Sequence, residues 1–423
     1  MRYSFYKPCS IVLIILYSAL QIVAQDTLRI PLPQAEAVFL NKNLELLAGK
    51  YNINIAEAQL IQSRLYANPN IAFSGNIYNP DNKKFFDIGN PTGQYTVDVQ
   101  QLILLAGKRN KQINMAKTNI AMTRNSFYDL LRTLRYTLRS DYYSLHYLHN
   151  SIAAYQLQIG SVEKLCDLFD QLQQKGVVTL KDAVRIKSLL YSLRTEQALL
   201  RNTFNNTQAE LQLLLQDNEH VYLPDEKPAA AFSVSGLPLE SLIDTALHNR
   251  EDLKLANNTL LYDKQNYAYQ KALAVPDLTL GAQFDKRGSF VDNATFLTMA
   301  IDLPFFNRNQ GNIKAADFSV QQSKLLADRQ KLQVETEVRN AYSNALNTDR
   351  LLKNIDPDFN NQFEQLLQSV MINFEKKNIS LLDFTDFYES YKQNVLQLNQ
   401  IQNERMQALE TLNFACGKIV TGN

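Results

Sequence analysis

The sequence KGVVTLKD at residues 175–182 recurs 201 residues later as KKNISLLD at residues 376–383. Each copy carries a Thr or Ser followed three residues later by Asp. This spacing predicts the start of a helix, because the hydroxyl can accept a hydrogen bond from the third backbone N–H while the acid reaches back to the cap. We therefore predict that Thr179 and Ser380 each cap a helix. Residues 174–180 and 376–380 are then tight turns between two helices.

The helices on either side of these turns are predicted to be long. From Leu381 to Leu412, eight of the ten positions reached by alternating steps of three and four are apolar. A repeat of 3.5 residues over four heptads is typical of coiled-coil packing along the helix. The segment from Gly107 to Lys175 contains no proline and would span roughly 100 Å as one helix. In the second copy we expect the corresponding helix to be interrupted at Asp356-Pro357.

The repetition covers the whole chain after residue 25. At a shift of 207 residues, Leu32, Ala67 and Pro69 align with the residues Leu239, Ala274 and Pro276. Each repeat begins with a helical segment, continues with two alternating segments and ends with the long hairpin. The predicted organisation is a signal peptide at 1–24, repeat 1 at 25–216, a linker at 217–238, repeat 2 at 239–417 and a tail at 418–423, with the leading helical segments at about 33–67 and 239–274.

Two segments of each repeat alternate between apolar and polar residues, as strands with one apolar face do. At about 10 residues they are long enough to cross a hydrocarbon core when tilted. Four strands cannot close a barrel, so several chains would have to share one. A half-buried sheet of a soluble protein is the alternative. The predicted strands are 71–78, 94–103, 278–285 and 295–303, and the residues expected to face a lumen are Asp98, Gln100, Thr279, Gln283, Asp285, Thr298 and Asp302.

The first 24 residues have the pattern of a secretory signal peptide. Arg2 and Lys7 precede an apolar run from Ile11 to Val23. Cys9 also precedes that run, so we expect no lipid anchor. Removing this segment changes 43 Lys+Arg to 41 against 42 Asp+Glu, a balance that argues against nucleic-acid binding. No later run of about 18 apolar residues predicts a transmembrane helix.

The residue types that carry catalysis or metal binding are not arranged in a recognisable pattern, and we predict no enzyme, no cofactor and no metal site. His146 and His149 have a spacing that can bind a metal, but no Cys and no further His lies near them in the sequence. Cys166 and Cys416 lie at very different distances from the two turns. A disulfide between them is therefore not expected.

The twofold order of helix, strand pair and long hairpin resembles the outer-membrane efflux protein family typified by TolC. Two local motifs resemble its CzcC-like branch, which serves heavy-metal cation export: Gly107-Lys108-Arg109 after the second strand, and LPFFNRNQG at residues 303–311 after the fourth. The resemblance implies an α+β duct without enzymatic activity. It implies a homotrimer with a 12-stranded barrel in the outer membrane of a Gram-negative bacterium and a helical tunnel in the periplasm.

The resemblance also implies the partners and the contact residues. A periplasmic adaptor would meet the hairpin tips, and an inner-membrane antiporter of the resistance-nodulation-division type would supply the energy. The implied cargo is a heavy-metal cation. A multidrug or type I protein secretion duct of the same fold, or a soluble periplasmic coiled-coil scaffold, remain alternatives. The tip residues that would contact the adaptor are Gly176, Val178, Thr179, Leu180 and Asp182 in repeat 1 and Lys377, Asn378, Ile379, Ser380 and Leu381 in repeat 2.

Members of the family close the periplasmic end with acidic rings, and by resemblance these are Asp383 and Asp386. The alternatives are that Asp383 only caps a helix and that Asp386 belongs to a solvated face. Lys377 stands where the family has a tip glycine, so the turn should differ or shift to Asn378. TolC has Tyr and Arg at the positions of Phe374 and Ile379. We therefore expect closure to depend on packing and on the acidic rings.

Overall fold

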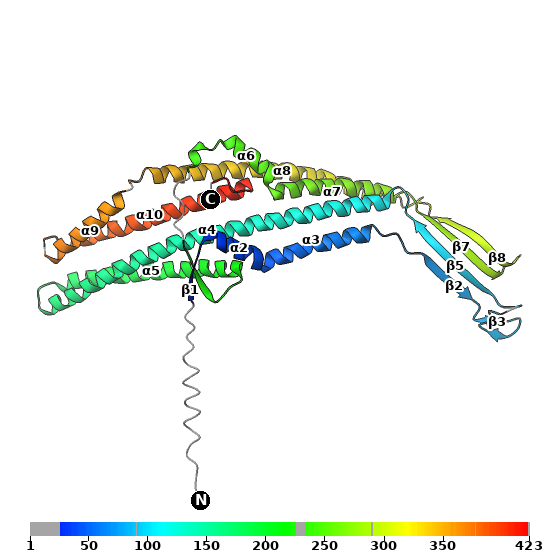
Figure 1. Cartoon of the computed structure of the whole chain (residues 1–423), viewed down its shortest axis with the longest axis horizontal. Coiled ribbons are helices and arrows are strands. Elements are labelled where there is room, and N and C mark those ends of the chain that lie inside the picture. The colour runs from blue at the N-terminus through cyan, green and yellow to red at the C-terminus, as the bar shows by residue number, and fades with distance from the viewer. Residues whose placement is uncertain are drawn as a thin grey trace, which may run out of the picture.

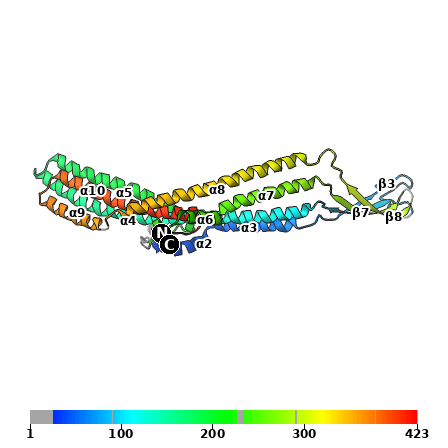
Figure 2. The ribbon, with the colours of Figure 1, turned by 90° about the horizontal axis from the view of Figure 1, so that it is seen from above.

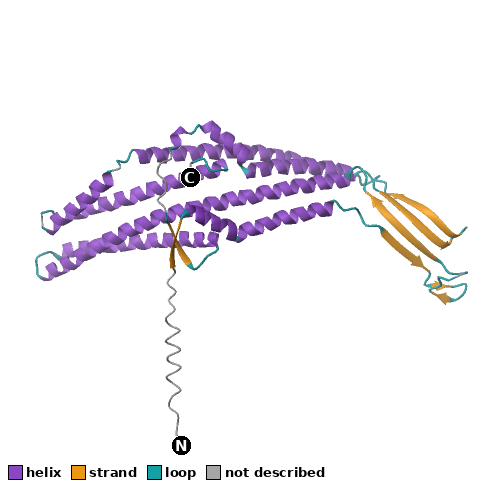
Figure 3. Ribbon diagram, viewed as in Figure 1, coloured by secondary structure: helices purple, strands orange, loops and turns teal. Residues whose placement is uncertain are grey.

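The structure is a computed structural model that describes residues 26–89, 91–225, 233–288, 291–356, 358–376 and 378–421. The predicted signal peptide and Lys377 lie outside the described residues. The chain is strongly elongated, with a sheet at one end, two helical hairpin tips at the other, and a thicker waist between them (Figures 1 and 3). The view from above shows the helices as a shallow layer that continues into the sheet (Figure 2).

The long hairpins form where the sequence predicts them. In repeat 1, the first helix of the hairpin runs unbroken for 67 residues. In repeat 2 the corresponding helix is interrupted, as expected around Asp356-Pro357, because one helix ends at Lys353 and the next begins at Phe359. The hairpin helices are α4 (Lys108–Gln174), α5 (Leu180–Leu215), α8 (Gln310–Lys353), α9 (Phe359–Glu375) and α10 (Leu381–Cys416).

Both predicted caps are present at the tips. The Thr179 hydroxyl accepts from the backbone N–H of Asp182, and Ser380 forms a reciprocal capping box with Asp383. The helices before the two tips end in the same hydrogen-bond pattern: Val177 N donates to Leu172 O at 2.9 Å, and Asn378 N donates to Asn373 O at 2.9 Å. The two turns therefore share this hydrogen bond, with Lys377, which lies outside the described residues, at the position of Gly176.

Each predicted leading helical segment is two helices. The breaks fall at Asn43 and Arg250, both with extended backbone. Asn43 caps the second helix by accepting from Leu46 N, and its amide donates to Leu214 O at 3.0 Å. The polar side chain thus ends one helix, begins the next and ties both to α5. The four helices are α2 (Leu32–Lys42), α3 (Leu44–Ser63), α6 (Leu239–Asn249) and α7 (Glu251–Leu273).

The four strands form one antiparallel sheet in the order β2-β5-β7-β8, so the two repeats meet between β5 and β7. The predicted strand 71–78 ends early. Tyr78-Asn79 (β3) pairs instead with Lys84-Phe85 (β4) in the loop that follows. The strands of the sheet are β2 (Asn70–Gly75), β5 (Tyr95–Ile103), β7 (Leu278–Arg287) and β8 (Asp292–Ile301).

The segment predicted as a linker contains regular structure at the waist. His220–Pro224 (β6) pairs in parallel with Asp26–Ile30 (β1), and Val234–Gly236 form a short 3-10 helix. The strand pair packs against α4, where the Tyr142 hydroxyl donates to Ile30 O at 3.0 Å. A parallel pairing of segments about 194 residues apart could not be anticipated from local pattern.

Buried apolar side chains form two clusters along the molecule. One lies at the waist and includes Phe39, Tyr142 and Val338. The other lies near the tips and includes Phe169, Phe384 and other residues of both hairpins. Among the described residues, no helix combines the length and hydropathy needed to span a membrane.

Candidate functional site: the strand faces and the hairpin tips

The register of the sheet gathers six of the seven predicted lumen residues on one face. Asp98 lies opposite Gln283, and Gln100 lies opposite Gly281, which in turn faces Thr298. Thr279 and Asp285 follow on the same face by alternation. Asp302 lies beyond the end of β8. The structure thus brings together one polar surface from both repeats.

The opposite face of the sheet is apolar and open. Leu297 is 82% exposed and Ile71 is 71% exposed. A soluble sheet would bury such side chains, because a contiguous apolar surface is costly to leave in water. The apolar side chains of this face are Ile71, Phe73, Tyr95, Val97, Val99, Ile103, Leu278, Leu280, Ala282, Phe284, Leu297, Met299 and Ile301, and the polar residues Gln101 and Thr295 also lie on it.

The two motifs that suggested the CzcC-like branch lie where strands pass into the long helices. Gly107 caps α4 with φ +66°, a left-handed conformation that favours glycine. The next residue, Lys108, is buried and its ammonium pairs with Asp277 at 2.7 Å. In repeat 2, Asn309 takes the left-handed cap position of α8 with φ +58°. Its amide donates to Gln270 O at 2.8 Å. Both motifs therefore fasten the start of a long helix, to α7 in one repeat and to the loop between α7 and β7 in the other.

At the other end, a stack of aromatic rings holds the two hairpins together. Phe374 of α9 stacks on Phe169 of α4 at 5.7 Å between centroids and on Phe384 of α10 at 4.4 Å. Beside this stack lies an apolar cavity of about 300 Å³ that both tips line. Its walls include Val178 and Ile379, two of the predicted adaptor contacts. Leu180 is exposed outside it.

The gate candidates both lie on the first turns of α10 and are exposed. The Asp383 carboxylate accepts from the Ser380 hydroxyl at 2.6 Å and from its backbone N–H at 3.3 Å. This residue therefore does cap the helix. Asp386 has no role in the cap. A ring of carboxylates requires further copies of the chain, so one protomer leaves the gate as a prediction.

A partly buried ionic cluster that the sequence did not reveal joins the hairpins above the tips. The Lys392 ammonium of α10, with the residue 5% exposed, pairs with Glu196 of α5 at 3.0 Å and with Glu389 at 2.8 Å. Tyr155 of α4 donates to the same Glu196 at 2.8 Å. Burial raises the pKa of Glu196, but the hydrogen bonds from Lys392 and Tyr155 outweigh it and hold that pKa below its usual value.

No group of three or more His, Cys, Asp or Glu side chains suited to a metal occurs in the part of the chain that the structure describes. His146 and His149 both lie on α4, and His149 is exposed. Cys166 and Cys416 are buried free thiols.

A family model described as outer membrane efflux protein matches residues 38–216 and 242–418 of this chain. The chain belongs to the outer membrane efflux protein family. This efflux protein therefore belongs in the outer membrane with its helical part in the periplasm, as the sequence predicted. No curated protein sequence matches the chain significantly.

Solved structures share the fold at low sequence identity. A structure of CusC has a TM-score of 0.73 and 16% identity, covering 92% of this chain and 92% of its own. The CmeC outer membrane channel of Campylobacter jejuni has a TM-score of 0.75 and 14% identity, covering 91% and 85%. A membrane protein of Pseudomonas aeruginosa has a TM-score of 0.76 and 19% identity, covering 94% and 92%. These likenesses confirm the predicted α+β, TolC-like fold.

Proposed function

We propose that this efflux protein is the outer-membrane channel of a tripartite efflux system and that its cargo is heavy-metal cations. Three copies would close a 12-stranded barrel, with a periplasmic adaptor at the tips and an inner-membrane antiporter as the pump. The observation that carries the proposal is the two-faced sheet joined to long hairpins. It offers an apolar surface to lipid and a polar one to solutes.

The cation cargo is supported by the charge of the polar face. Asp98 and Asp285 lie on it, so three copies would contribute six carboxylates. Such a surface raises the local concentration of cations and lowers that of anions. The two junction motifs also resemble those of the metal-export branch, although the structure gives them a fastening role.

Deleting the gene and measuring retained metal tests the cargo. We expect a sublethal challenge with copper, silver, zinc, cobalt or cadmium to leave the deletion strain with an excess of one or two of them, while efflux of a dye stays normal. Complementation with the wild-type gene should restore the metal level. Normal metals with retained dye would instead favour multidrug export. Normal values of both, with loss of a secreted protein, would favour type I secretion.

Single-channel recordings test the polar face separately. We expect the purified channel to be cation-selective and the Asp98→Asn plus Asp285→Asn double variant to lose much of that selectivity, because its six carboxylates become neutral. Gln283→Asn on the same face is the matched control and should leave the selectivity unchanged. Unchanged selectivity in the double variant would show that the ions pass elsewhere.

We further propose that Asp383 and Asp386 form the periplasmic constriction. The helix cap and the gate can be separated by two variants. Ser380→Ala weakens the cap and keeps both carboxylates, whereas Asp386→Asn keeps the cap and removes one ring. A conductance that changes in Asp386→Asn but not in Ser380→Ala would support the gate. The reverse pattern would assign the effect to the cap.

A further inference from the structure

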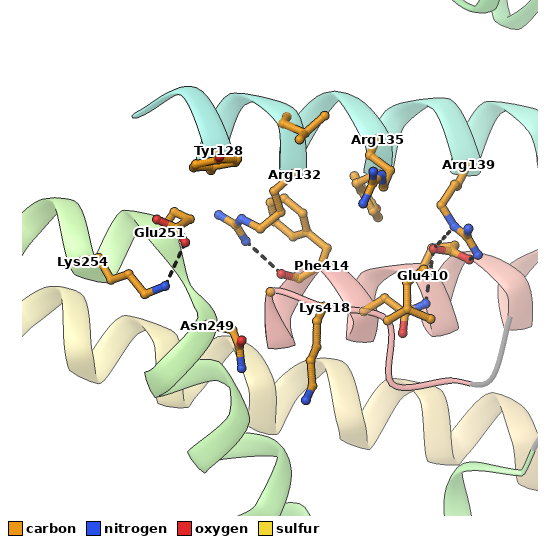
Figure 4. A pocket seen from close by; sticks show the side chains of 15 residues that line it. Tyr128, Arg132, Arg135, Arg139, Asn249, Glu251, Lys254, Glu410, Phe414 and Lys418 are labelled. Carbon is orange, nitrogen blue, oxygen red and sulfur yellow. Dashed lines mark hydrogen bonds and ion pairs between the residues drawn. The ribbon is translucent and has the colours of Figure 1, made fainter. Parts of the chain in front are cut away.

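A cavity of about 270 Å³ lies at the waist, where the end of α10 meets the start of α7 against α4 (Figure 4). Three arginines on one face of α4, Arg132, Arg135 and Arg139, line it at helical spacings of three and four residues. Lys254 and Lys418 add two further cations, and Glu251 and Glu410 are the acids of the lining. The cavity therefore has more cations than anions in its wall.

Most of these cations are already paired. Arg139 holds Glu410 with two hydrogen bonds, at 2.7 and 2.8 Å, and also pairs with Glu36 at 2.9 Å. Lys254 pairs with Glu251 at 2.8 Å. Arg132 behaves in the same way: it pairs with Asp129 at 2.6 Å and Asp252 at 3.6 Å, donates to Phe414 O at 2.8 Å and lies over the Phe414 ring. Both acids of the lining, Glu251 and Glu410, are thus already paired with a cation.

Arg135 differs from its two neighbours. It lies between them in Figure 4, with its guanidinium directed from α4 into the cavity. Among the described residues, its Nε is buried without a hydrogen-bond partner and its guanidinium forms no ion pair. Lys418, on the tail that forms the far wall, is exposed and forms no ion pair with the described residues either. A buried guanidinium nitrogen without an acceptor is unfavourable, because it has lost water and gained nothing.

The rest of the wall is mostly apolar or aromatic, with two amides, Asn249 and Asn413. Leu131 and Ile419 contribute aliphatic surface, and Tyr128 and Tyr136 contribute rings. A ligand with a charged end and a compact apolar body would match both parts. The volume is close to the lower end of the range for small-molecule sites.

The cavity lies within the helical layer of one protomer. Its walls come from α4, α7, α10, Asn249 at the end of α6 and the tail at 417–419, and α4 contacts α3, α5, α7 and α10. The open edges of the helical layer lie elsewhere. They carry exposed apolar side chains, such as Tyr51 and Ile55 on α3 and Leu325 on α8.

We propose that this cavity binds a small amphipathic organic anion, with its carboxylate or phosphate on Arg135 and its apolar body against Leu131 and Ile419. The site lies at the waist, away from the four-stranded sheet and the hairpin tips. It does not depend on the proposed cargo. Bound there, the anion would join α4 to the tail that follows α10.

Ligand-observed NMR on the purified, detergent-solubilised protein tests this with benzoate as the probe and benzamide as its neutral analogue. We expect saturable transfer to benzoate and at least a tenfold weaker signal for benzamide. Inorganic phosphate should compete only at high concentration, because it lacks the apolar body. Phosphate binding without benzoate binding would overturn the organic part of the proposal, and equal benzoate and benzamide binding would overturn the anion site.

The variants separate Arg135 from general surface charge. Arg135→Met keeps the length and should weaken benzoate binding at least tenfold, whereas Arg135→Lys should retain part of it. Arg124→Met, on the same helix but outside the cavity, is the matched control and should bind as the wild type does. If Arg135→Met fails to fold, Lys418→Met on the exposed tail should still weaken binding severalfold. Unchanged benzoate binding in Arg135→Met or in Lys418→Met would refute the assignment.

Discussion

The stability of the waist should depend on pH through one buried acid. Asp141 of α4 is 9% exposed, and its Oδ2 is buried without a hydrogen-bond partner. Burial raises the pKa of this carboxyl from 3.8 to about 7, and the charge of Glu210 adds to the effect. In the unfolded chain the carboxyl loses its proton near its ordinary pKa. The contribution of Asp141 to the stability of the folded state is therefore fully present below about pH 3.8 and is lost as pH rises through about 7.

The magnitude follows from the difference between the two pKa values. It is 7 − 3.8, or about 3 units, and each unit corresponds to ~1.4 kcal/mol. The cost of ionising Asp141 in the folded protein thus approaches ~4 kcal/mol above pH 7, an upper limit because water can enter. Asn has nearly the same shape and cannot ionise. Asp141→Asn should therefore be more stable than the wild type at pH 8 and similar to it at pH 4.

Thermal unfolding followed by circular dichroism in detergent checks this prediction. We expect the melting temperature of Asp141→Asn to exceed that of the wild type by several degrees at pH 8, with the gap closing as pH falls to 4. Asp328→Asn, an exposed acid of α8, is the control and should show no such dependence. A gap of the same size at both pH values would refute the reasoning, since it would not come from ionisation.

Four further substitutions have stability effects that follow from the structure. Lys392→Met should lower the stability by about 1 kcal/mol, because Glu196 loses its cation but is 35% exposed and stays partly hydrated. Recovery of the melting temperature in the double variant with Glu196→Gln checks this, and no recovery would contradict it. Gly176→Ala should lower the free energy of unfolding by about 1 kcal/mol, because Gly176 has a left-handed φ of +71° that is unfavourable for a residue with a Cβ. Gly160→Ala, inside α4 with open space at the added Cβ, should instead gain about 0.5 to 1 kcal/mol; equal melting shifts for the two would disprove the backbone argument. Ser380→Ala should cost about 1 kcal/mol as a lost cap, seen as faster hydrogen exchange at the start of α10; unchanged exchange would mean that the cap contributes little.

The sequence predicts the features that are written in local pattern. Thr179 and Ser380 begin helices because their hydroxyls and the following acids satisfy free backbone groups, and this chemistry spans only four residues. The alternation of Leu278 to Asp285 likewise predicts both the strand and its two faces. These local preferences are kept in the structure because the tertiary contacts agree with them.

Features that depend on distant segments could not be predicted. The pairing of β1 with β6 and the cluster of Lys392 with Glu196 each join residues nearly 200 positions apart, and nothing local marks the partners. Arg250 also looked like an ordinary helix residue. In the structure it is 2% exposed, has its guanidinium on Asp252 and Glu337, and lies where the helix breaks. The unpaired Arg135 was invisible for the same reason, since only the packed waist shows which arginines have acceptors.

The pairing of β1 with β6 has a consequence for the order in which the protein can assemble. When the chain emerges from its amino end, residues 26–30 appear before the rest of repeat 1. Their partner strand is complete once residue 224 follows. From that moment the strand pair holds the two ends of repeat 1 together. The long hairpin inside it can settle before any helix of repeat 2 has appeared. Repeat 2 would then fold onto a template, with α7 and α10 arriving at a surface of α4 that is already in place.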